Sequence, residues 1–273
     1  LLSGIVFGAK EHFSKDFKES LSTTGVLHVI AASGMNVSFI AAAMLFTFGL
    51  FMKRQVALVA GCLGIVFYVF LVGFEASIIR AAIMALLTFG AGMLGRQNWA
   101  LFALVLTGYM MLLWQPSFLF DVGFQLSFMA TFGILVWENW GLGWFARLGV
   151  LGKIFGENLV TTTAAQVATL PILLGVFGSV GTLGLLVNVL VLWVVPIVMT
   201  IGCLAVLVGL LLPPLAQLLL YLSLPFLLFF ETIVSVFGSF GWNFQVEKFT
   251  LAMGIGYYLL LGSIVVFVRN QKV

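Results

Sequence analysis

Charged side chains are scarce in this chain: Asp, Glu, Lys and Arg make up 8% of its 273 residues, whereas hydrophobic residues make up 63%. An ordinary soluble domain is about 25% charged, so this chain has too few polar groups to cover a globular surface in water. The apolar runs are unbroken and about twenty residues long, the length of a membrane-crossing helix. Membrane β-barrels instead use alternating segments of about ten residues. The composition therefore predicts an all-α fold, a polytopic transmembrane helical bundle.

Cysteine and histidine are also scarce, which limits the metal sites and catalytic groups that the chain could form. Cys62 and Cys203 lie in separate apolar runs, where packing is their expected role. The two histidines, His12 and His28, cannot build a three-histidine zinc site, and neither a His-Glu-x-x-His nor a phosphate-cradling Gly-x-x-x-x-Gly-Lys run is present. On one helix Ser33 and His28 would lie about 140° apart, a poor nucleophile–base pair. We expect no enzymatic activity, no metal and no cofactor.

Eight to ten membrane segments are expected, several of them broken or re-entrant. The clearest apolar runs cover 26–52, 56–74, 81–94, 99–114, 122–137 and 251–268. Residues 159–240 are nearly all apolar, yet five prolines interrupt them: Pro171, Pro196, Pro213, Pro214 and Pro225. Proline frees backbone carbonyls, which is tolerated at membrane depth where protein or water satisfies them. This half is expected to line a cavity, although membrane helices also simply tolerate proline better than soluble ones.

Basic residues set the expected topology. The net charge is +3, and most Lys and Arg lie in short breaks between apolar runs, as at Lys53, Arg54 and Arg96. This distribution is typical of loops held on the cytoplasmic side of a membrane. Two mixed segments, 1–24 and 138–158, are predicted to be amphipathic helices in the interface. We expect one integral membrane domain over 1–273 with no soluble domain, excised from a longer protein because no targeting segment follows Leu1.

A first polar cluster contains His28, Ser33 and Asn36. On one helix His28 and Asn36 are eight residues apart and project to nearly the same face. Ser33-Gly34 is a plausible helix break, and a broken helix offers unpaired N–H groups to an anion. The alternative is that these small and polar residues form hydrogen bonds between helices.

A second cluster, Glu75, Ser77 and Arg80, interrupts two apolar runs. A charged residue at bilayer depth costs at least roughly 2.5–3.5 kcal/mol and usually faces a partner or a water-filled cavity. The functional interpretation is an arginine presented to a water-filled path, where a guanidinium binds anions bidentately. The alternative is an arginine at the membrane boundary whose side chain extends to the headgroups.

A third cluster follows the loop at 115–117. Asp121 is placed to cap a helix through first-turn N–H groups, and capping alone explains it well. Gln125 lies one turn further on the same face, aimed into the bundle, with Ser127 beside it. Three further polar residues stand isolated in apolar surroundings: Gln166, Asn188 and Glu231.

Taken together, these stretches resemble the membrane competence domain of the bacterial DNA-internalisation proteins, the ComEC family. The matching stretches are Leu-Leu-x-Gly at the start, Gly25-x-x-His28-x-x-Ala-x-Ser33-Gly34, Gly73…Ser77-x-x-Arg80-Ala81, Asp121-Val-Gly-Phe-Gln125-Leu-Ser127-Phe128, Gln166-x-x-Thr169-x-Pro171 and Asn188. Their order and spacing are similar to the family over roughly residues 1–200, and only the composition is similar beyond about 210. Asn36 departs from the family, which usually has His there.

The resemblance implies a channel that imports single-stranded DNA across the cytoplasmic membrane during natural transformation. The partners it implies are single-stranded DNA, the lipid bilayer, oligonucleotide-binding and nuclease-like soluble domains of the same longer protein, and a cytoplasmic motor that pulls the DNA. The side chains expected to line the channel are Arg80, His28, Ser33, Asn36, Ser77, Gln125, Ser127, Gln166 and Asn188. The charges expected to orient them are Glu75, Asp121 and Glu231.

Two other functions fit the same residues. One is a secondary transporter of a small anion or a lipid-linked metabolite, in which Glu75, Arg80 and Glu231 serve as coupling and substrate groups at broken helices. The other is a scaffold that only anchors soluble domains. In a scaffold, replacing Gln125 or Asn188 by an apolar residue leaves DNA uptake intact.

Overall fold

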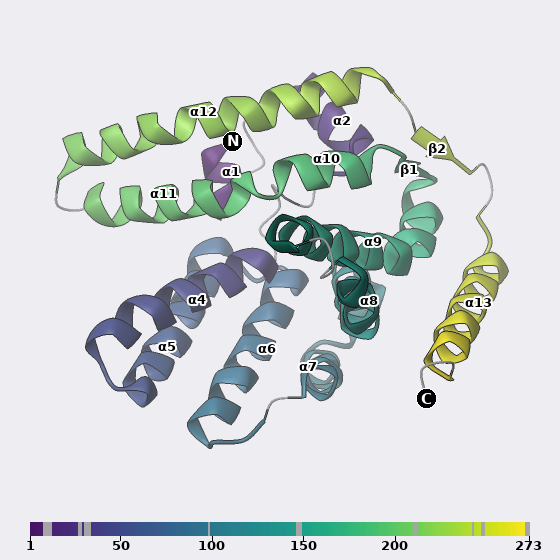
Figure 1. Ribbon diagram of the computed structural model, residues 1–273, viewed down its shortest axis with the longest axis horizontal. Helices are drawn as coiled ribbons and strands as arrows, with labels where there is room; N and C mark the ends of the chain where they lie inside the picture. The colour runs from purple at the N-terminus through teal and green to yellow at the C-terminus, as the bar shows by residue number, and fades with distance from the viewer. Residues whose placement is uncertain are drawn as a thin grey trace.

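The computed structural model is a helical bundle, as the composition predicts (Figure 1). It describes residues 1–7, 13–26, 29, 34–97, 99–145, 149–209, 212–241, 243–246 and 249–270. The helices are α1 (Leu2–Phe7), α2 (Lys15–Thr23), α4 (Gly34–Phe51), α5 (Arg54–Val72), α6 (Ala76–Met93), α7 (Ala100–Trp114), the 3-10 helix η1 (Pro116–Phe120), α8 (Val122–Phe145), α9 (Gly149–Phe177), α10 (Gly184–Val191), α11 (Val194–Gly209), α12 (Pro213–Ser239) and α13 (Leu251–Asn270).

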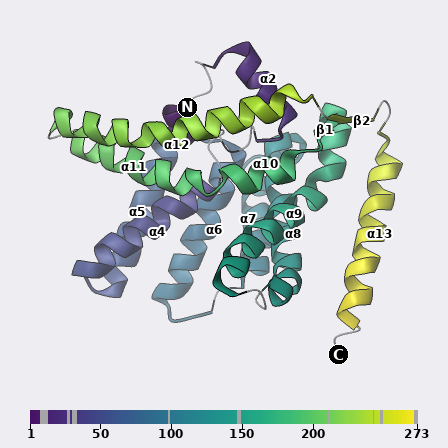
Figure 2. The same cartoon turned by 45° about the horizontal axis from the view of Figure 1, so that its top comes forward.

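The helices form two groups joined by a hairpin. Helices α4, α5 and α6 pack together, and α11 and α12 run side by side with α1 and α2 against them (Figures 1 and 2). The α8–α9 hairpin links the groups, because α8 contacts α6 and α9 contacts α10. Strand β1 (Ser179–Gly181) pairs antiparallel with β2 (Asn243–Gln245), with Val180 opposite Phe244. Helix α13 stands at the edge of the bundle against α9 (Figure 2).

Each group has its own apolar core. In the first, side chains of α4, α5 and α6 such as Val37, Ile65 and Ile78 are fully buried. In the second, Ile5 of α1 and Phe230 of α12 are fully buried against α10 and α11. Many large apolar side chains elsewhere face outward, as expected where the surrounding solvent is lipid.

The described residues contain fewer full-length spans than the eight to ten membrane segments predicted, together with shorter apolar helices. Among the described residues five helices are long and apolar enough to cross a membrane: α4, α5, α6, the Leu159–Phe177 part of α9, and α12. Helix α10 and the Val194–Val206 part of α11 form a further candidate, bent by 44° at their junction. Shorter apolar helices cover Ala100–Trp114, Val122–Trp137 and Leu251–Phe267. Counted together, they fall within the expected eight to ten.

Two boundaries differ from the prediction. The interruption before α6 covers only 73–75, because Gly73 ends α5 with φ at 109° and Glu75 already stands at the N-cap of the next helix. Arg80 therefore lies inside α6 and not before it. Residues 138–145 continue α8 and residues 149–158 begin α9, so the described part of 138–158 belongs to the hairpin and is no separate helix.

Pro171 lies within α9 and explains how α13 is attached. Proline has no N–H, so the carbonyl of Val167, four residues earlier, loses its usual helical donor. The hydroxyl of Tyr257 donates to that carbonyl at 3.0 Å, and the hydroxyl of Tyr258 donates to the carbonyl of Ala168 at 2.9 Å. The carbonyl that Pro171 leaves without its helical donor thus receives the Tyr257 hydroxyl instead, as backbone at membrane depth requires.

Candidate functional site

Arg80 is the best-defined candidate, because its guanidinium lies where three helices meet. Its Nη1 donates to Oγ1 of Thr131 on α8. Its Nη2 lies over Gly34, the first residue of α4: a Cβ added to Gly34 would lie 2.5 Å from this nitrogen. Arg80 Nε is enclosed by the protein and has no hydrogen-bond partner among the described residues. The side chain therefore joins α4, α6 and α8, with part of its hydrogen-bonding capacity unused.

Thr131 was not predicted from the sequence, although a signal for it existed. Ser127 and Thr131 are four residues apart on α8 and so share one face. The Thr131 hydroxyl donates to the Ser127 carbonyl at 2.9 Å while accepting from Arg80. The hydroxyl of Ser127 is enclosed and has no partner among the described residues. In the part of the chain that the structure describes, Arg80 on α6 and Ser127 on α8 thus each keep one unsatisfied polar atom, Nε and Oγ.

Asn36 lies in a separate polar contact. Its Nδ2 donates to the carbonyl of Ile5 at 2.8 Å, and the hydroxyl of Tyr68 donates to the carbonyl of Val6 at 3.0 Å. These carbonyls belong to the last described turn of α1 (Leu2–Phe7). Asn36 and Tyr68 therefore hold α1 against α4 and α5, which is the structural role left open in the sequence analysis.

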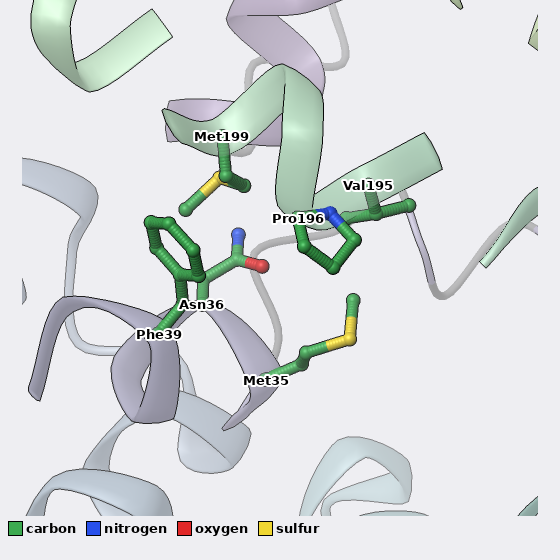
Figure 3. A pocket seen from close by; sticks show the side chains of 6 residues that line it. All are labelled: Met35, Asn36, Phe39, Val195, Pro196 and Met199. Atoms are coloured by element: carbon green, nitrogen blue, oxygen red, sulfur yellow. The ribbon is translucent and has the colours of Figure 1, made fainter. Parts of the chain in front are cut away.

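Asn36 also lines a small cavity at the start of α11. Figure 3 shows its amide beside Pro196 and Met199, and the other lining residues are Met35, Phe39 and Val195. The cavity holds about 10 Å³, which is marginal for one water molecule. It brings the first turns of α4 and α11 together, but it is far too small for a nucleotide.

Gln166 and Asn188 lie on two helices that contact each other, α9 and α10. Nε2 of Gln166 lies against Gly184, where an added Cβ would be 3.3 Å away. Asn188 follows one turn later on α10 and is 2% exposed, and its Oδ1 has no partner among the described residues. The structure therefore places Gln166 beside the start of α10 and Asn188 one turn further along the same helix, although more than twenty positions separate the two in sequence.

Asp121 and Gln125 form hydrogen bonds with nearby backbone at the start of α8. Oδ1 of Asp121 accepts from the N–H of Phe124 at 2.7 Å, which caps α8 as the alternative interpretation expected. Nε2 of Gln125 donates to the carbonyl of Leu119 at 2.8 Å and so holds η1.

The predicted charges at Glu75 and Glu231 lie at exposed positions. Glu75 stands at the start of α6, two residues before the half-buried Ser77. Glu231 lies on α12 beside a hollow lined by Leu1, Phe13, Ser14 and Phe17. His12, His28 and Ser33 lie outside the described residues, so their expected roles stay predictions.

Comparisons with known proteins indicate a family for this chain. A family model described as "Competence protein" matches residues 5–271. The chain is 25% identical over 191 residues to "ComE operon protein 3" of Bacillus subtilis (strain 168), a match that covers 70% of this chain and 24% of that protein. It is 30% identical over 133 residues to an "Uncharacterized protein" of Aquifex aeolicus (strain VF5), a match that covers 48% of this chain and 31% of that protein. The matched part is thus less than a third of either relative. No solved structure matches.

Proposed function

Because the chain belongs to the Competence protein family, we propose that it is the membrane domain through which single-stranded DNA crosses the cytoplasmic membrane during natural transformation. The likeness to ComE operon protein 3 supports this assignment. In this proposal the domain is a conduit and performs no chemistry on the DNA. Degradation of the second strand and the pulling force belong to other parts of a longer protein, an oligonucleotide-binding domain and a nuclease-like domain, and to a cytoplasmic motor.

The observation that carries the proposal is the guanidinium of Arg80. It lies within a candidate membrane span, and the only hydrogen-bond partner that the described residues provide is the neutral Thr131. A cation at such depth needs an anion or water, and single-stranded DNA brings one negative charge per nucleotide. Arginine is suited to this contact because its planar fork matches a phosphate group.

The path proposed for the strand follows the enclosed polar groups. Arg80 provides its positive charge, Ser77 and Ser127 provide hydroxyl groups, and Asn36, Gln166 and Asn188 provide amide groups elsewhere in the bundle. Weak contacts suffice, since conduction requires that the strand also leave. Gln125, His28 and Ser33 remain proposed members of the lining, with Glu75, Asp121 and Glu231 as orienting charges.

The test compares two arginines of the full-length protein. Arg80→Gln removes the positive charge from the junction of α4, α6 and α8, whereas Arg96→Gln removes one from the exposed position after α6. We expect transformation frequency to fall at least about tenfold for Arg80→Gln, the cost of one charge-assisted hydrogen bond. Arg96→Gln should leave it unchanged, with equal amounts of both proteins in the membrane. An unchanged frequency for Arg80→Gln would count against the proposal.

A secondary transporter is the second candidate, and the bend between α10 and α11 favours it. Transporters bind substrates near the bilayer midplane at discontinuous helices, and these helices meet at 44° close to Asn36. The measurement that separates the two is uptake into proteoliposomes. Proton-coupled accumulation of a small anion without passage of DNA would favour the transporter.

A further inference from the structure

The junction between the two helix groups is thin compared with the packing inside each group. The first group is α4, α5 and α6, and the second is α1, α2, α10, α11 and α12. Among the described residues, no side chain of the second group enters the first core, and Phe39 of α4 is the one side chain of the first group that packs against the second core. In the same part of the chain, no helix of the first group has an extensive contact with α11 or α12 (Figure 1). Separating the groups would therefore leave both cores intact.

Helix α1 carries the polar part of this junction. Its side chains belong to the second group: Ile5 and Val6 are buried in that core, and a Cβ added to Gly202 on α11 would lie 2.7 Å from Cγ2 of Val6. Its carbonyls meet the first group, because Ile5 O accepts from Asn36 at 2.8 Å and Val6 O accepts from Tyr68 at 3.0 Å. Helix α1 thus packs on α11 and is joined to α4 and α5 by hydrogen bonds.

The small cavity beside Asn36 lies in the same junction. Besides that amide, Met35 and Phe39 line it from α4, and Val195, Pro196 and Met199 line it from α11 (Figure 3). Its volume of about 10 Å³ shows that the two helices are nearly closed on each other here. The surfaces that meet are apolar, and methionine side chains adapt easily to a changed neighbour. No ion pair of the lining residues would be broken by moving them apart.

We propose that α4 and α11 separate at this junction, and that the gap between them is the opening through which the strand passes. The second group moves as one body because its helices share a core, and the contact of α9 with α10 stays as the pivot. Separation releases Asn36 and Tyr68 from α1, so that an amide and a hydroxyl then line the gap. The present structure is the closed state. The passage of DNA through the gap rests on the proposed function.

The first test locks the junction in the full-length protein after all other cysteines have been removed. A short, reducible thiol cross-linker joins Phe39→Cys to Met199→Cys, two positions that line the same cavity from opposite helices. The matched control joins Gly209→Cys to Ala216→Cys between α11 and α12, where an added Cβ at 209 would lie 3.3 Å from Cβ of Ala216. Cross-linking the first pair should abolish the uptake of labelled single-stranded DNA into proteoliposomes, and a reductant should restore it. The control pair should import DNA in both states.

A second measurement detects the opening without DNA. Met199 and Val198 are 1% and 0% exposed, but of these two only Met199 lines the junction. A charged thiol reagent should therefore modify Met199→Cys and leave Val198→Cys unmodified. Tyr68→Phe removes a hydrogen bond that holds the junction closed, so it should speed the reaction at 199 roughly 2- to 10-fold. If neither cysteine reacts, the opening is overturned.

Together the two measurements separate this inference from the proposed function. If the cross-linked and the reduced forms of Phe39→Cys with Met199→Cys import DNA equally well, the opening at this junction is overturned and the proposed function stands. If no variant imports DNA while Met199→Cys reacts and Val198→Cys does not, the junction opens and the proposed function fails.

Discussion

Tyr257 donates a hydrogen bond to the carbonyl that Pro171 leaves without a helical donor. We therefore predict that replacing Pro171 makes the loss of the Tyr257 hydroxyl nearly harmless to stability. Tyr257→Phe removes the hydroxyl that donates to the Val167 carbonyl at 3.0 Å. That carbonyl lacks its helical donor because residue 171 is proline. The carbonyl is left unsatisfied, at a cost of about 1–2 kcal/mol for this partly buried group. Pro171→Ala restores an N–H at 171, so Tyr257→Phe should then cost close to nothing.

The assay is a double-mutant cycle on the free energy of unfolding, measured by titrating the protein in mixed micelles with sodium dodecyl sulfate. We predict a coupling energy of about 1–2 kcal/mol between positions 171 and 257. Tyr258→Phe is the matched control, since its hydroxyl donates to Ala168, whose helical donor is residue 172. Its cost should depend much less on the residue at 171. Additive effects of Pro171→Ala and Tyr257→Phe would refute the explanation.

Three further predictions follow from the described contacts. Gly34→Ala should lower transformation frequency about tenfold, because the added methyl group would displace the guanidinium of Arg80. Gly49→Ala on the same helix is the control: its methyl group meets no neighbour and should have no effect on transformation frequency. Tyr68→Phe should lower the free energy of unfolding by about 1–3 kcal/mol, because the carbonyl of Val6 on α1 loses the Tyr68 hydroxyl as a donor. A change below about 0.5 kcal/mol, the size of a neutral surface substitution, would contradict this prediction. Asp121→Ala should lower the free energy of unfolding by about 0.5–2 kcal/mol through loss of the α8 cap, and an unchanged free energy of unfolding would contradict the cap.

The sequence predicted the helices well and the contacts between them poorly. Apolar runs marked the ends of α5 and α7 to within about two residues, because lipid exposure makes hydropathy a direct signal. The sequence analysis placed Arg80 in an interruption between two apolar runs, whereas the structure places it inside α6, a candidate membrane span. Thr131 was missed because a threonine in an apolar run usually bonds its own helix, and its second partner lies 51 residues away.

Hydrogen bonds between residues far apart in the sequence could not be predicted from any local pattern. The amide of Asn36 donates to a carbonyl 31 residues earlier, and Tyr257 donates to one 90 residues earlier. Such partners depend on how the helices pack, which a single sequence does not encode in any spacing. Asn36 thus has a bracing contact at the end of α1, in addition to its expected place on a polar face.

The central claim is that the charge of Arg80 serves the passage of DNA. The most direct measurement reconstitutes the full-length protein in liposomes and follows the nuclease-protected uptake of labelled single-stranded DNA. We predict uptake by the wild-type protein and by Arg96→Gln, and a loss of at least about tenfold for Arg80→Gln. Equal uptake by Arg80→Gln and the wild-type protein would contradict the account.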